Sequence, residues 1–226
     1  MGELHLEVNI HRLHTDFNVD VTTGPPEVFY CETISQTGTA HYRHKKQSGG
    51  PGQFAEVEIQ IDPLARGEGI QFESNITSGR IPKEYIPSVE KGIRQAAKQG
   101  IVQGFPVVDF KITLCDGRYH ENDSSPLAFE WAGKMAFREA AVNSTPLLLE
   151  PIMLVNVITP SEYMGLCIGD LNRRLARVQT LERNTANIVA LVPLVTMFGY
   201  IGDLRALSSG RAVYNMHFDH YGVAIQ

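Results

Sequence analysis

The stretch Asp116-Gly117-Arg118-Tyr119-His120-Glu121-Asn122-Asp123-Ser124-Ser125 joins two segments whose patterns predict different structures. Residues 105–115 before it are apolar and rich in β-formers, which predicts a strand. After it, Ser125-Pro126 supplies a helix N-cap and a proline at the first helical position. A strand therefore leads through a polar loop into a helix, and His120 and Asp123 lie at the exposed tip of that loop. The loop alone is also typical of an ordinary solvated turn.

Residues 27–141 predict one α+β domain around this turn. Residues 54–61 alternate between apolar and polar side chains, as a half-buried strand does. Between residues 87 and 100, Val89 and Ile93 share one helical face, and Gly100 ends the helix. Further strands are expected at residues 28–37, 41–47 and 70–76, and a further helix at residues 126–142.

Residues 150–220 predict a second unit with the order β-α-β-β-α-β. Its helices are expected at residues 161–175 and 194–207, and Gly210 follows the second helix as a stop signal. Its strands are expected at residues 152–158, 177–182, 187–192 and 211–220. This order of elements is the ferredoxin-like arrangement.

Residues 1–23 predict a small β-α-β segment. Residues 3–8 alternate as a strand, residues 10–17 can form two helical turns, and residues 19–22 are typical of another strand. Such a segment is too small to close a core of its own, which indicates a part of something longer. Gly24-Pro25-Pro26 marks its boundary.

The composition is that of an ordinary globular protein. Of 226 residues, 43% are hydrophobic and 20% are charged, which is ample for a core. Three scattered cysteines, Cys31, Cys115 and Cys167, argue against a disulfide framework and favour a reducing compartment. Neither a transmembrane-length apolar run nor a signal segment is present, so a cytoplasmic location is expected. Because the formal net charge is −5, any binding to nucleic acid must rest on local basic clusters.

Motifs for catalysis and metal binding are weak. The phosphate-binding motif G-x-x-x-x-G-K-[ST] is absent, so no nucleoside triphosphate site is expected. Cysteine pairs that would complete a zinc site are missing, and His-x-x-His on a strand points its rings to opposite faces. His120 and Asp123 resemble an acid–base pair that lacks a nucleophile. We therefore expect no catalytic residue, metal or cofactor here, in spite of the pairs His11/His14, His41/His44 and His217/His220.

One basic cluster lies in the first domain. Residues 41–46, His-Tyr-Arg-His-Lys-Lys, lead into the glycine-rich turn Gln47-Ser48-Gly49-Gly50. Cations around an aromatic ring, followed by accessible backbone amides, suit phosphates and stacked bases. Alternatively, Lys45 and Lys46 protect an edge strand against aggregation.

Arginines gather at two places in the second unit. Arg173 and Arg174 lie near the expected end of its first helix, and Arg205 and Arg211 flank the end of its second. Cations at these positions complement the helix dipole. By spacing alone they are ordinary caps, and contacts to RNA are the alternative.

Motifs in order along nearly the whole chain resemble those of elongation factor G. In the first half they are Gly2-Glu3-Leu4-His5-Leu6-Glu7, Gln47-Ser48-Gly49-Gly50, Ile81-Pro82-Lys83-Glu84-Tyr85-Ile86-Pro87, and Tyr119-His120 with Asp123-Ser124-Ser125. In the second half they are Leu148-Leu149-Glu150-Pro151-Ile152-Met153, Ile168-Gly169-Asp170-Leu171-Asn172-Arg173-Arg174, Phe198-Gly199-Tyr200 with Asp203-Leu204-Arg205, and Phe218-Asp219-His220-Tyr221.

The resemblance implies the C-terminal part of that family. Residues 1–23 would be a remnant of domain III, residues 24–148 domain IV and residues 149–226 domain V. The implied fold class is α+β. A blade like the second domain of ribosomal protein S5, with a left-handed βαβ crossover, precedes a ferredoxin-like βαββαβ domain.

The resemblance also implies a function in translation. In this family of translational GTPases, the tip of domain IV contacts the ribosome, ribosomal RNA and the tRNA–mRNA duplex during translocation. GTP and magnesium bind in a domain that this chain lacks, so a monomer without enzymatic activity is expected. Carried over, the domain IV contacts would be Lys45, Lys46, Gln47, Ser48, Gly49, Gly50, His120 and Asp123, and those of domain V would be Arg173, Arg174, Arg205 and Arg211.

Three positions depart from the family pattern. Pro51 stands where many members carry a basic residue, Pro126 where an acidic residue is common, and Cys31 where arginine is usual. These departures leave open a ribosomal protection-type protein or a free-standing ribosome-binding paralogue. A hydrolase that uses His120 is a further alternative.

Overall fold

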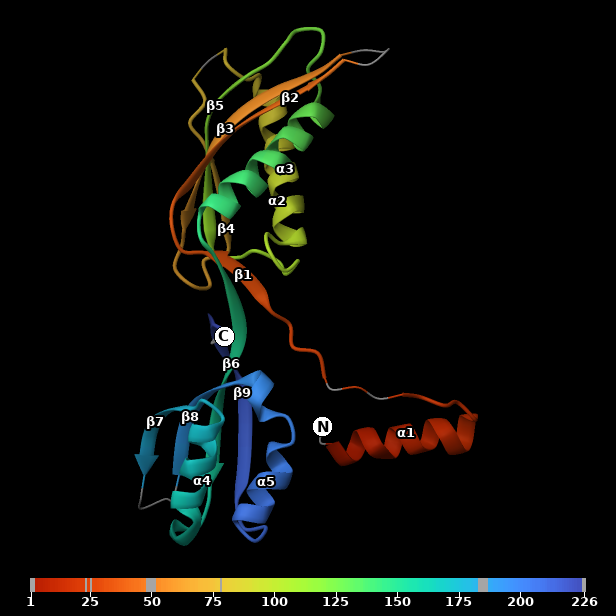
Figure 1. Ribbon diagram of the computed structural model, residues 1–226, viewed down its shortest axis with the longest axis vertical. Coiled ribbons are helices and arrows are strands. Elements are labelled where there is room, and N and C mark those ends of the chain that lie inside the picture. The colour runs from red at the N-terminus through yellow and green to blue at the C-terminus, as the bar shows by residue number, and fades with distance from the viewer. Residues whose placement is uncertain are drawn as a thin grey trace.

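The computed structural model describes residues 3–22, 24, 26–47, 52–77, 79–182 and 187–224. Two sheet-based bodies follow one another along the long axis, and the N-terminal helix lies apart from both (Figure 1). Within the described ranges, no helix combines the length and apolar composition that a membrane crossing requires.

The N-terminal segment is one helix, α1 (Glu3–Phe17). The strands expected at residues 3–8 and 19–22 are therefore wrong. Alternation at residues 3–8 concealed a helical pattern, because apolar residues also recur with a spacing of three to four at positions 6, 10, 13 and 17. Residues 18–22 have no partner strand and run as an extended connection.

The upper body in Figure 1 is a four-stranded sheet with two helices on one face. Its order is β2-β3-β5-β4, and all neighbours are antiparallel except β4 and β5. Because the parallel strands β4 and β5 are joined through α2, they form a βαβ crossover. The elements are β2 (Gly38–Lys46), β3 (Gln53–Pro63), β4 (Ile70–Ser74), η1 (Lys83–Tyr85), α2 (Ile86–Gln99), β5 (Phe110–Arg118) and α3 (Pro126–Asn143).

Two glycines allow α2 and α3 to pack with their backbones in close approach. A Cβ atom at Gly92 would lie 1.9 Å from the carbonyl oxygen of Glu130. One at Gly133 would lie 2.6 Å from the carbonyl oxygen of Val89. The helices then press against the buried side of the sheet, where the rings of Phe110 and Phe137 contact each other at 5.2 Å between centroids.

Two strands begin later than the sequence pattern predicts. β5 starts at Phe110, although a strand was expected from residue 105, and β1 covers only Cys31–Ile34 of the expected residues 28–37. Before β5, the carboxylate of Glu32, which is 2% exposed, accepts backbone N–H groups of Ile101, Val102, Gln103 and Phe105 and holds these residues as a loop. Val107 then forms one isolated bridge with Glu32, and Asp109 adopts a left-handed φ of 59° immediately before β5 begins.

The lower body in Figure 1 confirms the ferredoxin-like prediction. Its strands lie in the order β7-β8-β6-β9, and every neighbouring pair is antiparallel. The helix expected at residues 194–207 is interrupted, because Gly199 adopts a left-handed φ of 76° between η2 and α5. The elements are β6 (Pro146–Ile158), α4 (Ser161–Arg173), β7 (Arg177–Glu182), β8 (Asn187–Pro193), η2 (Leu194–Met197), α5 (Tyr200–Leu207) and β9 (Val213–Val223).

Strand β6 connects the two bodies. Its first residues pair with β1, and from Leu149 onward it pairs with β9. The domain boundary expected between residues 148 and 149 therefore falls inside a continuous strand. A guanidinium N–H of Arg66, in the loop after β3, also donates to the carbonyl oxygen of Tyr221 in β9. The upper body, which we call the blade, is thus attached to the lower body by strand pairing and by a side-chain contact.

Candidate functional site

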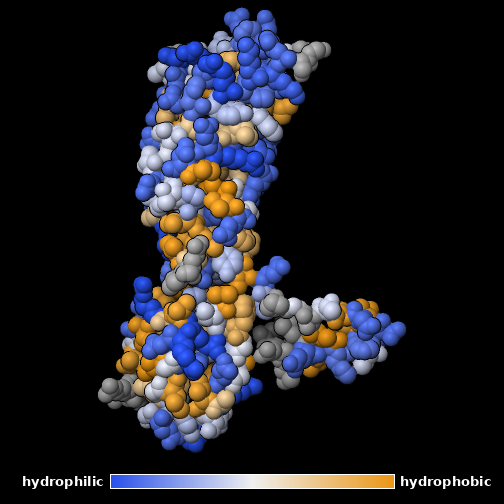
Figure 2. Space-filling model, viewed as in Figure 1, coloured by the Kyte–Doolittle hydropathy of each residue, from blue (hydrophilic) through white to orange (hydrophobic). Residues whose placement is uncertain are grey.

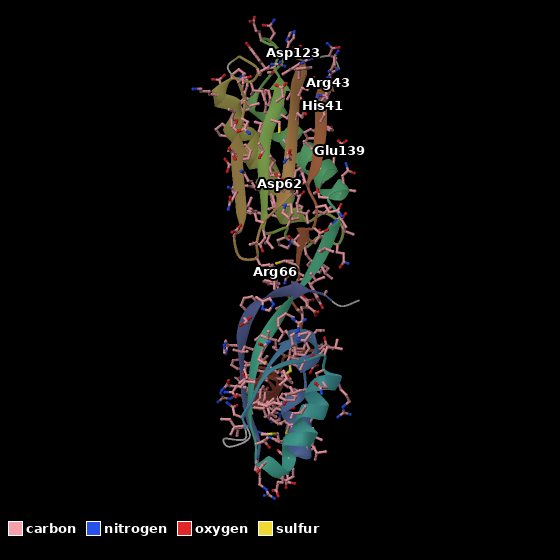
Figure 3. The ribbon with its side chains drawn as sticks, turned by 90° about the vertical axis from the view of Figure 1, so that its left-hand side faces the viewer. His41, Arg43, Asp62, Arg66, Asp123 and Glu139 are labelled. Carbon is pink, nitrogen blue, oxygen red and sulfur yellow. The ribbon has the colours of Figure 1, made fainter. Side chains whose placement is uncertain are left out.

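The tip loop, residues 119–125, lies between β5 and α3 at the end of the blade far from the lower body (Figure 3, where Asp123 is labelled). The first three residues of the stretch that begins at Asp116 belong to β5 rather than to the loop. Ser125 caps α3 as predicted, since its Oγ accepts the Ala128 N–H at 3.2 Å, and Pro126 occupies the first turn. Figure 2 shows a largely hydrophilic surface at this end.

Ser124 fastens the tip loop to β3. Its hydroxyl donates to the carbonyl oxygen of Phe54 at 2.7 Å and accepts the backbone N–H of His120 at 2.9 Å. The N–H of Phe54 in turn donates to the carbonyl oxygen of Asp123 at 2.8 Å. The loop backbone is therefore fixed at both ends, which holds its side chains in a defined arrangement.

His120 and Asp123 lie side by side on this fixed loop. The Nδ1 atom of His120 is 3.3 Å from Oδ2 of Asp123, and the two side chains are 56% and 30% exposed. The ring also contacts Phe54 edge-on, at 6.4 Å between centroids. Nδ1 faces the loop, where the Asn122 N–H approaches it at 3.4 Å, and within the described ranges Nε2 has no partner and can serve an outside acceptor. This arrangement can donate a hydrogen bond or stack on a flat ring, and it lies on an exposed loop as the sequence predicted.

The end of the glycine-rich turn reaches the same place. A Cβ atom at Gly52 would lie 2.6 Å from Oδ1 of Asp123, so a larger residue there would require the Asp123 side chain to move. Lys45 and Lys46 precede the turn, Gln47 is its first residue, and all three are exposed. The structure thus brings these residues and the tip loop to one end of the blade. Three further predicted contacts, Ser48, Gly49 and Gly50, lie outside the described residues.

The histidines of β2 contact different partners. His41 Nε2 lies 2.9 Å from Oε1 of Glu56, on the helix-free face of the sheet. His44 Nε2 lies 3.0 Å from Oε1 of Gln53, and its ring contacts Trp131 of α3 on the other face. This confirms the prediction that the two rings point to opposite faces. Within the described ranges, no group of three or more potential ligands gathers around a common point.

Sequence reasoning missed Glu56, a buried acid that lies beside His41, Arg43 and Arg118. Its side chain is 5% exposed and lies 2.6 Å from Nε of Arg43 and 3.8 Å from Nε of Arg118. Burial alone would raise the pKa of the Glu56 carboxyl, but hydrogen bonds from Arg43 and His41 outweigh burial and lower it. The available signal was the alternation of β3, which puts Glu56 on the polar face.

Two of the four arginines of the lower body are engaged in its packing. Arg174, 13% exposed, bonds Asp170 at 2.9 Å and Asp203, and its guanidinium lies 4.9 Å from the centre of the Tyr200 ring. Arg211 bonds Glu162 at 2.8 Å and lies over Tyr163. These contacts favour the structural interpretation of both residues.

The other two arginines are more accessible. Arg173 is 73% exposed, although it bonds Asp170 at 3.0 Å. Arg205 is exposed near the end of α5. Arg211 is also 58% exposed, so of these four arginines only Arg174 is largely withdrawn from solvent.

An S5-like blade with clustered polar tip loops, joined to a ferredoxin-like body, places this chain among translation-factor domains. The family model for "Elongation factor G, domain IV" matches residues 26–145, and that for "Elongation factor G C-terminus" matches residues 147–225. The chain belongs to the elongation factor G family.

Similar proteins agree with this assignment. Elongation factor G 2 of Hahella chejuensis is 53% identical over 98% of this chain and 33% of its own length. Elongation factor G of Ehrlichia chaffeensis is 54% identical over 98% of this chain and 32% of its own length. The chain thus spans about a third of these relatives. A crystal structure of a protein from Thermus thermophilus has a TM-score of 0.88 at 39% identity, covering 99% of this chain and 34% of the other.

Proposed function

We propose that this chain is the ribosome-contacting part of a translocation factor. Its blade tip would contact the tRNA–mRNA duplex and ribosomal RNA, and Arg173 and Arg205 would contact ribosomal RNA from the second body. The observation that carries the proposal is the tip itself. Ser124 fixes a loop that presents an exposed imidazole, and two exposed lysines lie at the end of β2, on the other side of β3.

Each tip group has a chemical use against RNA. The imidazole of His120 donates to a ribose or phosphate oxygen or stacks on a base. Lys45 and Lys46 neutralise phosphates. None of these roles forms or breaks a covalent bond, so the chain would act as a positioning module in the cytoplasm. GTP hydrolysis would belong to another part of the protein, and this part would work as a monomer without its own cofactor.

The relatives' names favour this function over a ribosomal protection protein. Residues 24–148 and 149–226 would serve as domains IV and V, with β6 as the rigid element between them. Because β6 is continuous, a displacement of the blade by contacts at its tip would also displace the lower body.

Pelleting of the purified chain with intact ribosomes across a salt series tests the proposal. We expect saturable binding that weakens with salt, and a smaller salt slope in Lys45→Gln/Lys46→Gln because phosphate contacts are lost. His120→Ala should weaken binding while changing the unfolding free energy by at most about 0.5 kcal/mol. Arg94→Gln/Lys98→Gln, on the exposed side of α2, is the charge-matched control. Absence of binding at low salt, or equal loss in the control, would refute the proposal.

A further inference from the structure

Strand β2 is an open edge of the blade sheet. It is the first strand in the order β2-β3-β5-β4, and within the described ranges its only partner strand is β3. The pairing runs over nine residues, Gly38–Lys46, without a register shift or a proline. The opposite edge, β4, has only five residues. Alternate backbone N–H and C=O groups of β2 therefore face away from the sheet, where a further strand can pair with them.

The side chains of β2 differ between its two faces. His41, Arg43 and Lys45 alternate along the helix-free face and are exposed. Tyr42 and His44 point to the other face, where Tyr42 packs against the core and His44 contacts α3. One face of the edge thus offers cations, and the other offers aromatic rings.

Helix α3 adds an exposed apolar surface beside the second face. Leu127 and Trp131, one helical turn apart, are 66% and 48% exposed. The Trp131 ring is tilted against His44 at 6.4 Å between centroids, and Lys134 lies over the same ring at 5.9 Å. A strand added beside β2 would therefore bring its α3-side residues next to His44 and within reach of the Trp131 ring.

We propose that the β2 edge binds an extended segment of a partner protein in which acidic and apolar residues alternate. The segment pairs its backbone with β2 as an additional strand. Its carboxylates lie opposite His41, Arg43 and Lys45, and its apolar side chains lie toward His44 and Trp131. The site does not depend on the proposed function, because its ligand is a polypeptide rather than RNA.

The acids near this edge leave its cations accessible to such a segment. Glu56 and Glu58 are on β3, one strand further from the added segment than the cations are. Glu139 and Asp62 lie closer to the lower body than the labelled residues of β2 do (Figure 3). Among the residues that the structure describes, Lys45 forms no ion pair. The carboxylates of the segment are therefore expected at the half of the edge nearer the tip.

A second copy of the chain does not complement this edge. Two β2 strands paired about a two-fold axis would place His41, Arg43 and Lys45 opposite the same cations, and like charges directly opposite destabilise a strand pair. Lysine at an edge also protects it against aggregation. An edge with that role alone would bind no peptide, which makes peptide binding the decisive observation.

The probe is a peptide as long as β2, nine residues, in which glutamate and valine alternate. A control peptide has the same composition, with the glutamates and the valines in two blocks. The chain has one tryptophan, Trp131, so a peptide that covers its ring should shift its emission to shorter wavelength. A fluorescent label on the peptide gives Kd by anisotropy for the variants that lack this signal.

The geometry predicts that the alternating peptide binds and that the block peptide binds much more weakly. Trp131→Ala should raise Kd about tenfold, whereas Leu166→Ala, at an exposed apolar site on α4, should leave it unchanged. Lys45→Gln should raise Kd about two- to fivefold, and Lys98→Gln, at an exposed site on α2, is its charge-matched control. Equal Kd values for the two peptides, or equal effects in variants and controls, would overturn the proposal.

N-methylation of the peptide tests the backbone pairing without any change to the protein. Alternate N–H groups of a strand face opposite edges, so methylation of the glutamate amides blocks one edge and methylation of the valine amides blocks the other. One of the two methylated peptides should bind about tenfold more weakly than the parent peptide. Full affinity in both would overturn the proposal.

Two further outcomes separate this site from the proposed function. Displacement of the peptide by polyuridylate at equal charge concentration would indicate a non-specific anion site and overturn the proposal. Failure of the wild-type chain to bind the alternating peptide would overturn it as well, whereas the proposed function is tested by ribosome pelleting and would stand or fall on that result alone.

Discussion

Glu32→Gln is expected to destabilise the blade strongly. The carboxylate accepts four backbone N–H groups, at 2.6 and 3.0 Å on one oxygen and at 2.8 and 3.3 Å on the other. Glutamine replaces one oxygen with an NH2 donor, which loses two of these bonds and places donor against donor. A hydrogen bond to a charged group contributes roughly 1.5–3 kcal/mol. Since the site is 2% exposed, water cannot replace the acceptor, and a loss of about 3–5 kcal/mol follows.

Urea unfolding followed by tryptophan fluorescence measures this loss of stability in the blade. The chain has one tryptophan, Trp131, and it lies in α3 of the blade, so its fluorescence reports the unfolding of that unit. With a slope of about 2 kcal/mol per molar urea, the midpoint should fall by about 2 M. Glu139→Gln, on an exposed site of α3, should shift stability by no more than about 0.5 kcal/mol. A Glu32→Gln midpoint within about 0.5 M of wild type would refute this account of the loop before β5.

Further predictions concern packing, pH and the second body. Gly92→Ala should lower the free energy of unfolding in urea by about 1–3 kcal/mol, because the added methyl group meets the α3 backbone. Gly165→Ala, in open space on α4, should instead raise it by up to about 1 kcal/mol. The reverse order of stability would contradict the close approach of α2 and α3. Burial raises the pKa of Glu56, but hydrogen bonds from Arg43 and His41 outweigh it and lower that pKa below its ordinary value. The stability advantage of wild type over Glu56→Gln should therefore hold above about pH 4.3 and disappear as pH falls further, and an advantage that grows in acid would be inconsistent with this. Arg174→Met should lower the free energy of unfolding by about 3–5 kcal/mol in a thermal melt, because the buried Asp170 carboxylate loses its closest cation. Unchanged stability together with weaker ribosome binding would instead show that Arg174 contacts the ribosome.

The local sequence pattern was enough to predict an element where that element buries one face. The alternation of residues 54–61 predicted β3, and the Ser125-Pro126 signal predicted the start of α3. The strand at Arg177–Glu182 has the predicted bounds. In each case the side-chain period or the cap carries the information, and neither depends on distant residues.

Long-range contacts account for what the pattern missed. The loop of residues 101–105 is held by Glu32, about 70 residues earlier in the chain, and a sequence gives no sign that a strand carboxylate will bind a remote loop. In α1 the alternating and helical periods coincide over a few residues, and only the longer window separates them.

At the candidate site, sequence placed His120 and Asp123 on an exposed loop but gave Ser124 no role. Its two hydrogen bonds reach a carbonyl of β3 and an amide of the loop, and both depend on tertiary structure. For Arg174 the spacing favoured an ordinary cap, and Asp203 and Tyr200, which the sequence could not place beside it, favour the same structural interpretation.

Photo-crosslinking from the tip tests the central claim most directly. A photoreactive amino acid replaces Tyr119, which is exposed beside His120, or Lys98 on α2 as the control, and each protein is irradiated with ribosomes carrying tRNA and mRNA. A tip that contacts RNA predicts crosslinks to ribosomal RNA, tRNA or mRNA from position 119 and few from position 98. Equal yields from the two positions, or crosslinks from position 119 to proteins alone, would contradict the account.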